Sequence, residues 1–161
     1  TAFPRIALPL STTIVSFFKF LPTIPVFLII KFASGLAFSW NMLWGLVVIL
    51  VALVFGLGIA ILISAANVYV RDIANFLPYL NRMLLYVSPV LFEASQVSQK
   101  LAFFKNINPF FPILDSWSRV MVHNEALDWS EVGKGAIWAF GTFAIGTYLF
   151  LSREREFAVR V

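Results

Sequence analysis

The sequence predicts an all-α integral membrane protein, and three observations lead to this fold class. Of its 161 residues, 60% are hydrophobic and only 12% are charged, whereas a soluble domain carries about 25% charged residues. No Asp, Glu, Lys or Arg lies between Lys31 and Arg71, and about 20 apolar residues are enough for one helix to cross the bilayer. Apolar runs such as residues 46–55 do not alternate with polar residues, which excludes the strands of a membrane β-barrel.

We expect a single transmembrane domain with about four membrane-spanning helices. Their lengths lie near the ~17–25 residues that a spanning helix needs. We place them at residues 11–33, 42–66, 76–92 and 132–151. The chain begins at Thr1 rather than methionine, so we expect a fragment or a processed chain that is incomplete at its N-terminus.

Basic residues predict the orientation of the spans. With four spans, both ends of the chain and the connection at residues 67–75 share one side. That side carries Arg5, Arg71 and three arginines of the C-terminal tail, so we place it in the cytoplasm. The net charge of +4 is small and sits near span ends, which indicates membrane topology rather than nucleic-acid binding.

The first span contains Lys19, Pro22 and Pro25. Each proline removes a backbone donor and kinks or breaks a helix. We favour a kinked helix from which Lys19 reaches the cytoplasmic interface, and the alternative is that Lys19 lies on a polar pathway.

The second span carries Gly56, Ala60 and Ser64 at intervals of four. Small residues at this spacing let two helix backbones approach closely. We favour packing within one subunit over a seam between two copies.

A segment at about residues 98–120 is too apolar for a free loop and too interrupted for a span. We expect two short re-entrant or interfacial helices between the last two spans, broken at Asn108 and Pro109. Trp117 and Trp129 fit the preference of aromatic residues for the membrane–water interface.

No catalytic or metal site is predicted. There is no cysteine, so disulfides and thiolate metal sites are excluded, and the single histidine, His123, lacks the spacing of a metal site. The stretch at residues 133–135 fails the pattern of a phosphate-binding loop, because Asp128 replaces its first glycine and Gly135 its Ser or Thr. We therefore expect no enzyme activity, no bound cofactor and no ATP hydrolysis by this chain itself.

The pair Arg71–Asp72 directly follows the second span, and the sequence supports two interpretations of it equally. One is a basic membrane anchor with an adjacent counter-ion. The other is a cytoplasmic elbow that transmits motion from a partner.

Several short motifs occur in order along nearly the whole chain. They are FPR at residues 3–5, LPLS at 8–11, NVYVRDI at 67–73, YVSPV at 86–90, Asn108–Pro109 with Arg119 beyond it, and a closing tail rich in Arg, Glu and Phe. In this order they resemble the permease subunits of type 2 ATP-binding-cassette exporters of polysaccharide, teichoic acid and O-antigen.

The resemblance implies a six-span permease of a bacterial or archaeal inner (plasma) membrane, of which this chain holds the last four spans. Two copies would pair as a homodimer, and two separate ATPase subunits, which bind ATP and Mg, would dock in the cytoplasm. It also implies two sets of site residues: Pro4, Arg5, Arg71 and Asp72 near the ATPase interface, and Asn108, Pro109 and Arg119 at an outer gate. Lys19, Pro22 and Pro25 depart from the family pattern and leave the path of the first span open.

A permease of this kind can bind sugar rings through aromatic side chains that permit sliding, and 17% of the residues are aromatic. Arg82 either faces the channel, where it meets anionic phosphate groups of the cargo, or snorkels from the first turns of its span, which we slightly favour. The candidates for channel contact are Tyr79, Arg82, Tyr86, Ser88 and Phe92.

The expected function is therefore half of an ATP-driven export channel for a lipid-linked polysaccharide or polyol phosphate in the cell envelope. One alternative is an exporter of drugs or lipids in the same superfamily. Another is a membrane scaffold protein without transport activity, which would need no ATPase partner.

Overall fold

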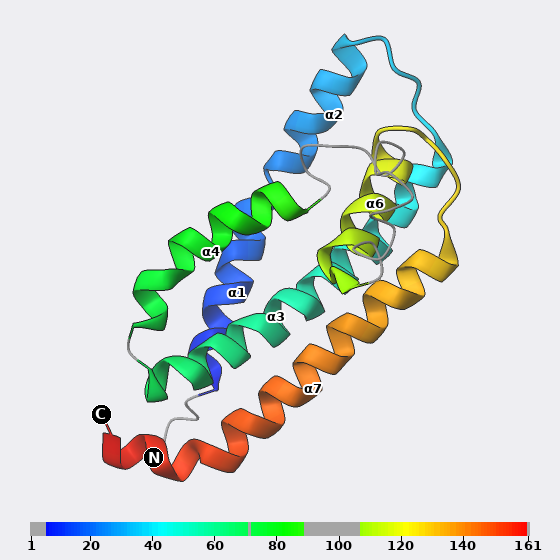
Figure 1. Cartoon of the computed structure of the whole chain (residues 1–161). Helices are drawn as coiled ribbons and strands as arrows, with labels where there is room; N and C mark the ends of the chain where they lie inside the picture. The colour runs from blue at the N-terminus through cyan, green and yellow to red at the C-terminus, as the bar shows by residue number, and fades with distance from the viewer. Residues whose placement is uncertain (1–5, 71, 89–106, 161) are drawn as a thin grey trace.

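The computed structural model describes residues 6–70, 72–88 and 107–160, and its ordered elements are helices (Figure 1). The all-α membrane fold class is confirmed. In chain order the elements are α1 (Ala7–Phe20), α2 (Thr23–Ala33), the 3-10 helix η1 (Trp40–Trp44), α3 (Gly45–Tyr69), α4 (Ile73–Val87), α6 (Phe110–Met121) and α7 (Trp129–Arg160).

Three stretches of the described residues are long and apolar enough to cross a membrane: Ala7–Ala33, Trp40–Tyr69 and Trp129–Ser152. They overlap the spans predicted at residues 11–33, 42–66 and 132–151. The span predicted at residues 76–92 overlaps α4, which has 15 residues and ends at Val87. Residues 89–92 lie outside the described part of the chain, so a fourth span stays a prediction.

The first of these stretches is interrupted, as its prolines predict. α1 ends at Phe20 and α2 begins at Thr23. Pro22 and Pro25 have no backbone N–H, so two bonds of the helical ladder are missing here. The N–H of Ile24 donates to the carbonyl of Leu21 at 3.1 Å, a tighter turn than that of an α-helix.

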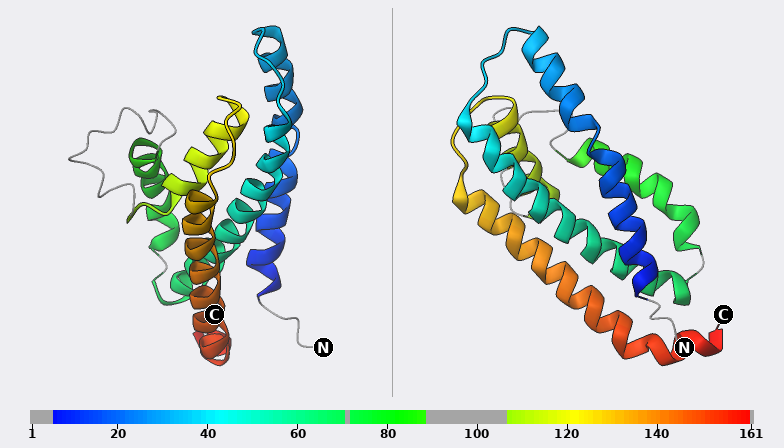
Figure 2. Two further views of the ribbon diagram at one scale, coloured as in Figure 1. Left: turned by 90° about the vertical axis from the view of Figure 1, so that its right-hand side faces the viewer. Right: turned by 180° about the vertical axis from the view of Figure 1, so that it is seen from behind.

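Two ends of the bundle can be distinguished (Figures 1 and 2). The start of α1, the turn between α3 and α4, and the last turns of α7 lie together at one end, which we call the terminal end. The end of α2, η1 and the start of α7 lie at the opposite end, which we call the far end. The described residues nearest the two chain ends therefore lie at the same end of the bundle as the described part of the connection at residues 67–75, and the membrane side that this end faces stays a prediction.

α3 and α7 run side by side from the far end to the terminal end (Figure 2). Their backbones approach closely at Gly58 of α3 and Gly146 of α7. A methyl group added at Gly58 would lie 2.6 Å from the backbone nitrogen of Phe143, and one at Gly146 would lie 2.9 Å from the carbonyl oxygen of Gly58. Only glycine permits this separation of the two backbones.

The predicted stripe of small residues on α3 belongs to a different contact. A methyl group added at Gly56 would have Thr13 of α1 as its nearest neighbour, at 3.9 Å. The stripe therefore begins at a contact within the subunit, as we favoured, but the close contact with α7 is made by Gly58, two residues later and on another face of α3.

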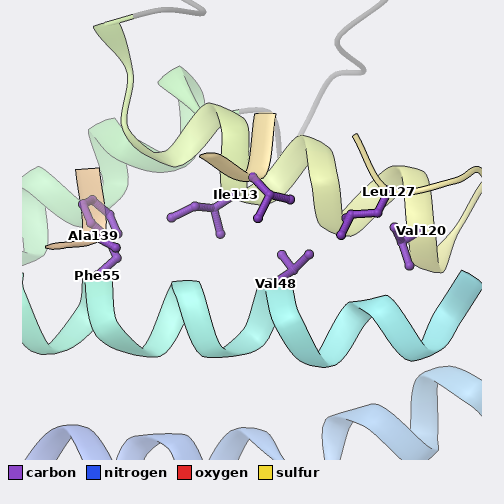
Figure 3. Close-up of a cluster of buried hydrophobic side chains, with 7 residues drawn as sticks. Val48, Phe55, Ile113, Val120, Leu127 and Ala139 are labelled. Carbon is purple, nitrogen blue, oxygen red and sulfur yellow. The ribbon is translucent and has the colours of Figure 1, made fainter. Parts of the chain in front are cut away.

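α6 lies between α3 and α7 in the half of the bundle near the far end (Figure 1). Each of the three helices supplies two buried residues seven positions apart, and Figure 3 shows several of these side chains meeting above α3. Such spacing keeps one face of a helix turned toward its partners. The pairs are Val48 and Phe55, Ile113 and Val120, and Val132 and Ala139, joined by Leu127.

Tryptophans gather at the far end. Trp40 and Trp129 are exposed, and the ring of Trp129 packs edge-on against Trp44 with ring centroids 5.2 Å apart. Exposed tryptophans at one level are typical of a membrane–water interface. Trp117, for which we predicted the same setting, is instead half-buried against the core and contacts Phe20.

Candidate functional site

α4 carries a polar and aromatic stripe along its exposed face. The stripe residues follow one another at alternating intervals of three and four, which places them on one face of a helix. They are Asp72, Asn75, Tyr79, Arg82 and Tyr86, and all are exposed. Of these, Tyr79, Arg82 and Tyr86 are predicted channel residues, and Asp72 is a predicted coupling residue.

The opposite face of α4 rests on the protein. Ile73, Leu77 and Leu84 are its half-buried residues, and they lie about half a turn around the helix from the stripe. Figure 2 shows α4 on the opposite side of the α3–α7 pair from α1. The stripe therefore points away from the described part of the chain.

The other predicted channel residues are placed differently. Ser88 follows the last residue of α4, is buried, and donates its backbone N–H to the carbonyl of Leu84 at 2.8 Å. It does not share the exposed stripe. Phe92 lies outside the described residues, as do Pro4, Arg5 and Arg71 of the predicted coupling set.

Asp72 stands at the terminal end, immediately before α4. It occupies the N-cap position, yet its side chain makes no capping hydrogen bond to the helix. An aspartate here usually accepts from the backbone of the first turn. Its exposed carboxylate is therefore not used to begin the helix.

The predicted gate residues lie in or next to α6, a short helix that packs against α3 and α7. Asn108 accepts from the N–H of Phe110 at 3.0 Å, and Pro109 precedes the first helical residue. The ring of Phe110 packs against Phe55, with centroids 5.1 Å apart. Phe55 is midway along the stretch Trp40–Tyr69, so α6 begins level with the middle of this candidate span. Its 12 residues rise about 18 Å, roughly half a bilayer.

Two glycines make room for α6. A methyl group at Gly45 of α3 would lie 3.0 Å from the sulfur of Met121, and one at Gly135 of α7 would lie 3.1 Å from Ile113. The first described residues of the gate segment, residues 107–109, lead directly into α6, which packs against α3 and α7 at these glycines. The predicted helix before Asn108 falls largely on residues outside the described ranges.

Arg119, the third predicted gate residue, is held by acids. Its Nε donates to Asp115 at 2.8 Å, and Glu125 lies 3.9 Å from its guanidinium. The Asp115 side chain is only 8% exposed. Partial burial alone would lower the pKa of Arg119, but the charge and hydrogen bond of Asp115, with the weaker attraction of nearby acids, raise it. The guanidinium thus stays charged and fixes the last turns of α6.

Sequence reasoning missed a buried lysine at the far end. Lys31, in the last turn of α2, is 2% exposed, and its ammonium donates to the carbonyl of Met121 at 2.6 Å and to Oδ1 of Asn124 at 2.7 Å. The available signal was a single charge in the last turn of an apolar span. Asn75, which completes the stripe on α4, was also missed, and its spacing from Tyr79 would have revealed it.

No family model matches the chain, and no solved structure matches it. Two proteins of Klebsiella pneumoniae named O-antigen export system permease protein RfbA are each 29% identical over 98% of this chain, and one of Myxococcus xanthus with that name is 25% identical over 97%. The chain is therefore similar in sequence, along nearly its whole length, to curated O-antigen export permeases.

The match to these permeases extends over nearly all of the chain but not over all of theirs. The chain spans about three-fifths of the length of the curated relatives, 61% in each case. These matches confirm the resemblance to the type 2 permeases that the motifs indicated. The described part of the chain contains three candidate membrane spans.

Proposed function

We propose that the chain forms part of a permease subunit that exports a lipid-linked polysaccharide or polyol phosphate through the inner membrane. The observation that carries the proposal is the match to O-antigen export permeases over 97–98% of the chain. The fold agrees with this role, because its long apolar helices suit a bilayer. A permease of this class is a transport subunit, and we assign ATP hydrolysis to a separate partner.

The stripe on α4 supports a polar cargo. Two exposed tyrosines, Tyr79 and Tyr86, offer ring faces on which sugar rings can stack, and Arg82 between them offers a cation for a phosphate group. An arginine within a membrane seldom faces lipid. The stripe points away from the chain, so a second surface has to complete the channel around it, and we propose a second copy of the permease.

The terminal end is the proposed docking site of the ATPase subunits. We place this end in the cytoplasm, because Arg5, Arg71 and the arginines of the tail favour that side. Pro4, Arg5, Arg71 and Asp72 are the proposed coupling residues. The exposed carboxylate of Asp72 makes no capping hydrogen bond to α4, and this supports a contact with a partner subunit.

Replacing Arg71 or Asp72 with alanine should uncouple ATP hydrolysis from export. Because Asp72 is exposed and caps no helix, its removal should cost less than about 0.5 kcal/mol of stability. We expect cargo-stimulated ATP hydrolysis by the reconstituted exporter to fall severalfold, with unchanged membrane insertion. Ser152→Ala, an exposed residue near the same end, is the matched control, and normal coupling in both test variants would remove this assignment.

Deletion of the gene for the full-length protein tests the function itself. Cells without the permease should lack the polysaccharide at their surface and accumulate its lipid-linked form inside, and the wild-type gene should restore export. Normal surface polysaccharide in the deletion strain would refute the proposal. Loss of resistance to drugs, with polysaccharide unchanged, would instead indicate the alternative cargo.

A further inference from the structure

Among the residues that the structure describes, no acid pairs with the buried ammonium of Lys31. Within the described residues, its hydrogen-bond partners are the carbonyl of Met121, Oδ1 of Asn124 and, weakly, the sulfur of Met42 at 3.7 Å, and none of the ion pairs involves it. Burying a charge is costly unless its hydrogen-bonding capacity is satisfied. An ammonium group has three N–H donors, and these three acceptors can satisfy them, so the hydrogen bonds hold the Lys31 side chain in this position.

Asn124 is the centre of the same cluster. Its backbone has a φ of 58°, a left-handed conformation that asparagine tolerates better than most residues. Its Nδ2 donates to the carbonyl of Ala37 at 2.9 Å, and its own carbonyl accepts from Asn41 at 3.0 Å. Asn124 therefore joins α2, the link that follows α2, η1 and the link between α6 and α7.

α2 has little else to hold it to the bundle. Val26, Ile29, Ile30 and Phe32 are exposed, and among the helices of the described part its main neighbour is α1. A cavity of about 460 Å³ lies between α2 and α3, lined by residues that include Ile24, Leu28, Leu46 and Met121. At its other end, α2 begins at the proline-containing break, where two backbone bonds are missing.

We propose that Lys31 and Asn124 form a clasp that fixes both α2 and the end of α6, with the break at residues 21–25 as the hinge of α2. The carbonyl that Lys31 binds belongs to Met121, the last residue of α6. Releasing the clasp frees α2 to swing away from α3 and removes a constraint on α6. Lys31 is thus a positioning residue of the outer gate, and this gating role rests on the proposed function of α6.

Distances between spin labels test the clasp in the full-length permease reconstituted in lipid. Cysteines placed at Phe32 of α2 and Ile137 of α7, both exposed, accept the labels, and these 161 residues contain no other cysteine. The wild type should give one narrow distance within each subunit. Lys31→Met should add a longer distance, with the ratio of open to closed molecules rising roughly ten- to hundredfold, as expected when hydrogen bonds to a charged group are lost.

Three further variants provide a second test of the clasp and two controls. Asn124→Gly preserves the left-handed backbone but removes the side chain, so it should open α2 as Lys31→Met does, and it decides the matter if Lys31→Met does not fold. Asn124→Asp loses the hydrogen bond to Ala37 but turns the contact with Lys31 into an ion pair, so it should keep the narrow distance. Lys19→Met removes an exposed lysine from the same span and should have no effect.

The outcomes separate the clasp from the proposed function. A single unchanged distance in folded Lys31→Met or Asn124→Gly overturns the clasp, whatever the export activity. If the distance distribution also broadens in Lys19→Met, the effect comes from a general loosening of the first span, and this would also overturn the clasp. Failure of the wild-type protein to export polysaccharide would refute the proposed function but leave the distance measurement intact.

Discussion

Gly58→Ala should lower the free energy of unfolding by roughly 2–3 kcal/mol, although alanine is the better helix former by about 1 kcal/mol. The added methyl group would lie 2.6 Å from the backbone nitrogen of Phe143 and 2.7 Å from Oγ1 of Thr142. A backbone atom cannot rotate away as a side chain does, so α3 and α7 would have to separate. Gly146→Ala should have a similar effect, because its methyl group would meet the carbonyl oxygen of Gly58.

Gly141→Ala is the matched control for this prediction. Gly141 lies on α7 five residues before Gly146, and a methyl group there would have no neighbour within 4 Å. Its replacement should leave stability unchanged or raise it by up to about 1 kcal/mol. Unfolding by denaturing detergent in bicelles, measured on the full-length protein, compares the three variants. Equal stability of all three would mean that the close contact of α3 and α7 is absent in the folded protein.

The double substitution Tyr79→Ala and Tyr86→Ala should reduce polysaccharide export about tenfold while leaving the amount of protein in the membrane unchanged. The two side chains are 65% and 66% exposed, so their loss removes little packing from the subunit. If sugar rings slide along the stripe, each lost ring face removes one stacking contact in the path. Export is measured as the rate at which newly made polysaccharide reaches the cell surface.

Tyr148 offers the matched control for the stripe. It is a tyrosine with 73% exposure, but it lies on α7. Tyr148→Ala should export at the wild-type rate. An equal loss of export in this control, or normal export by the double variant, would remove α4 from the path of the cargo.

The long spans could be predicted from the sequence, because their signal is local. An uninterrupted apolar run already fixes the element and its environment, and Pro22 and Pro25 mark the break of the first span without reference to any neighbour. The start of α6 was predicted for the same reason, since Asn108 and Pro109 act on the residues that follow them directly.

The partners of these elements could not be predicted, because they depend on contacts between distant residues. The sequence spacing of Gly56, Ala60 and Ser64 predicts close packing but does not say which face of α3 meets which helix, and the close contact with α7 is made by Gly58. Lys31 resembles an ordinary charge at the end of a span, and its partner Asn124 is 93 residues away. The stripe on α4 was partly predicted, because its members share one helical face whatever surrounds them.

The glycine contact makes the two parallel helices differ mechanically from the first span. Backbones that touch through glycine have no flexible side chains between them to absorb a displacement, so we expect α3 and α7 to move as one rigid unit between the terminal end and α6. The first span, jointed at its prolines, yields instead. We therefore expect a force applied at the end of α3 to be carried by this rigid unit to the far end of the bundle, while the first span bends at its prolines.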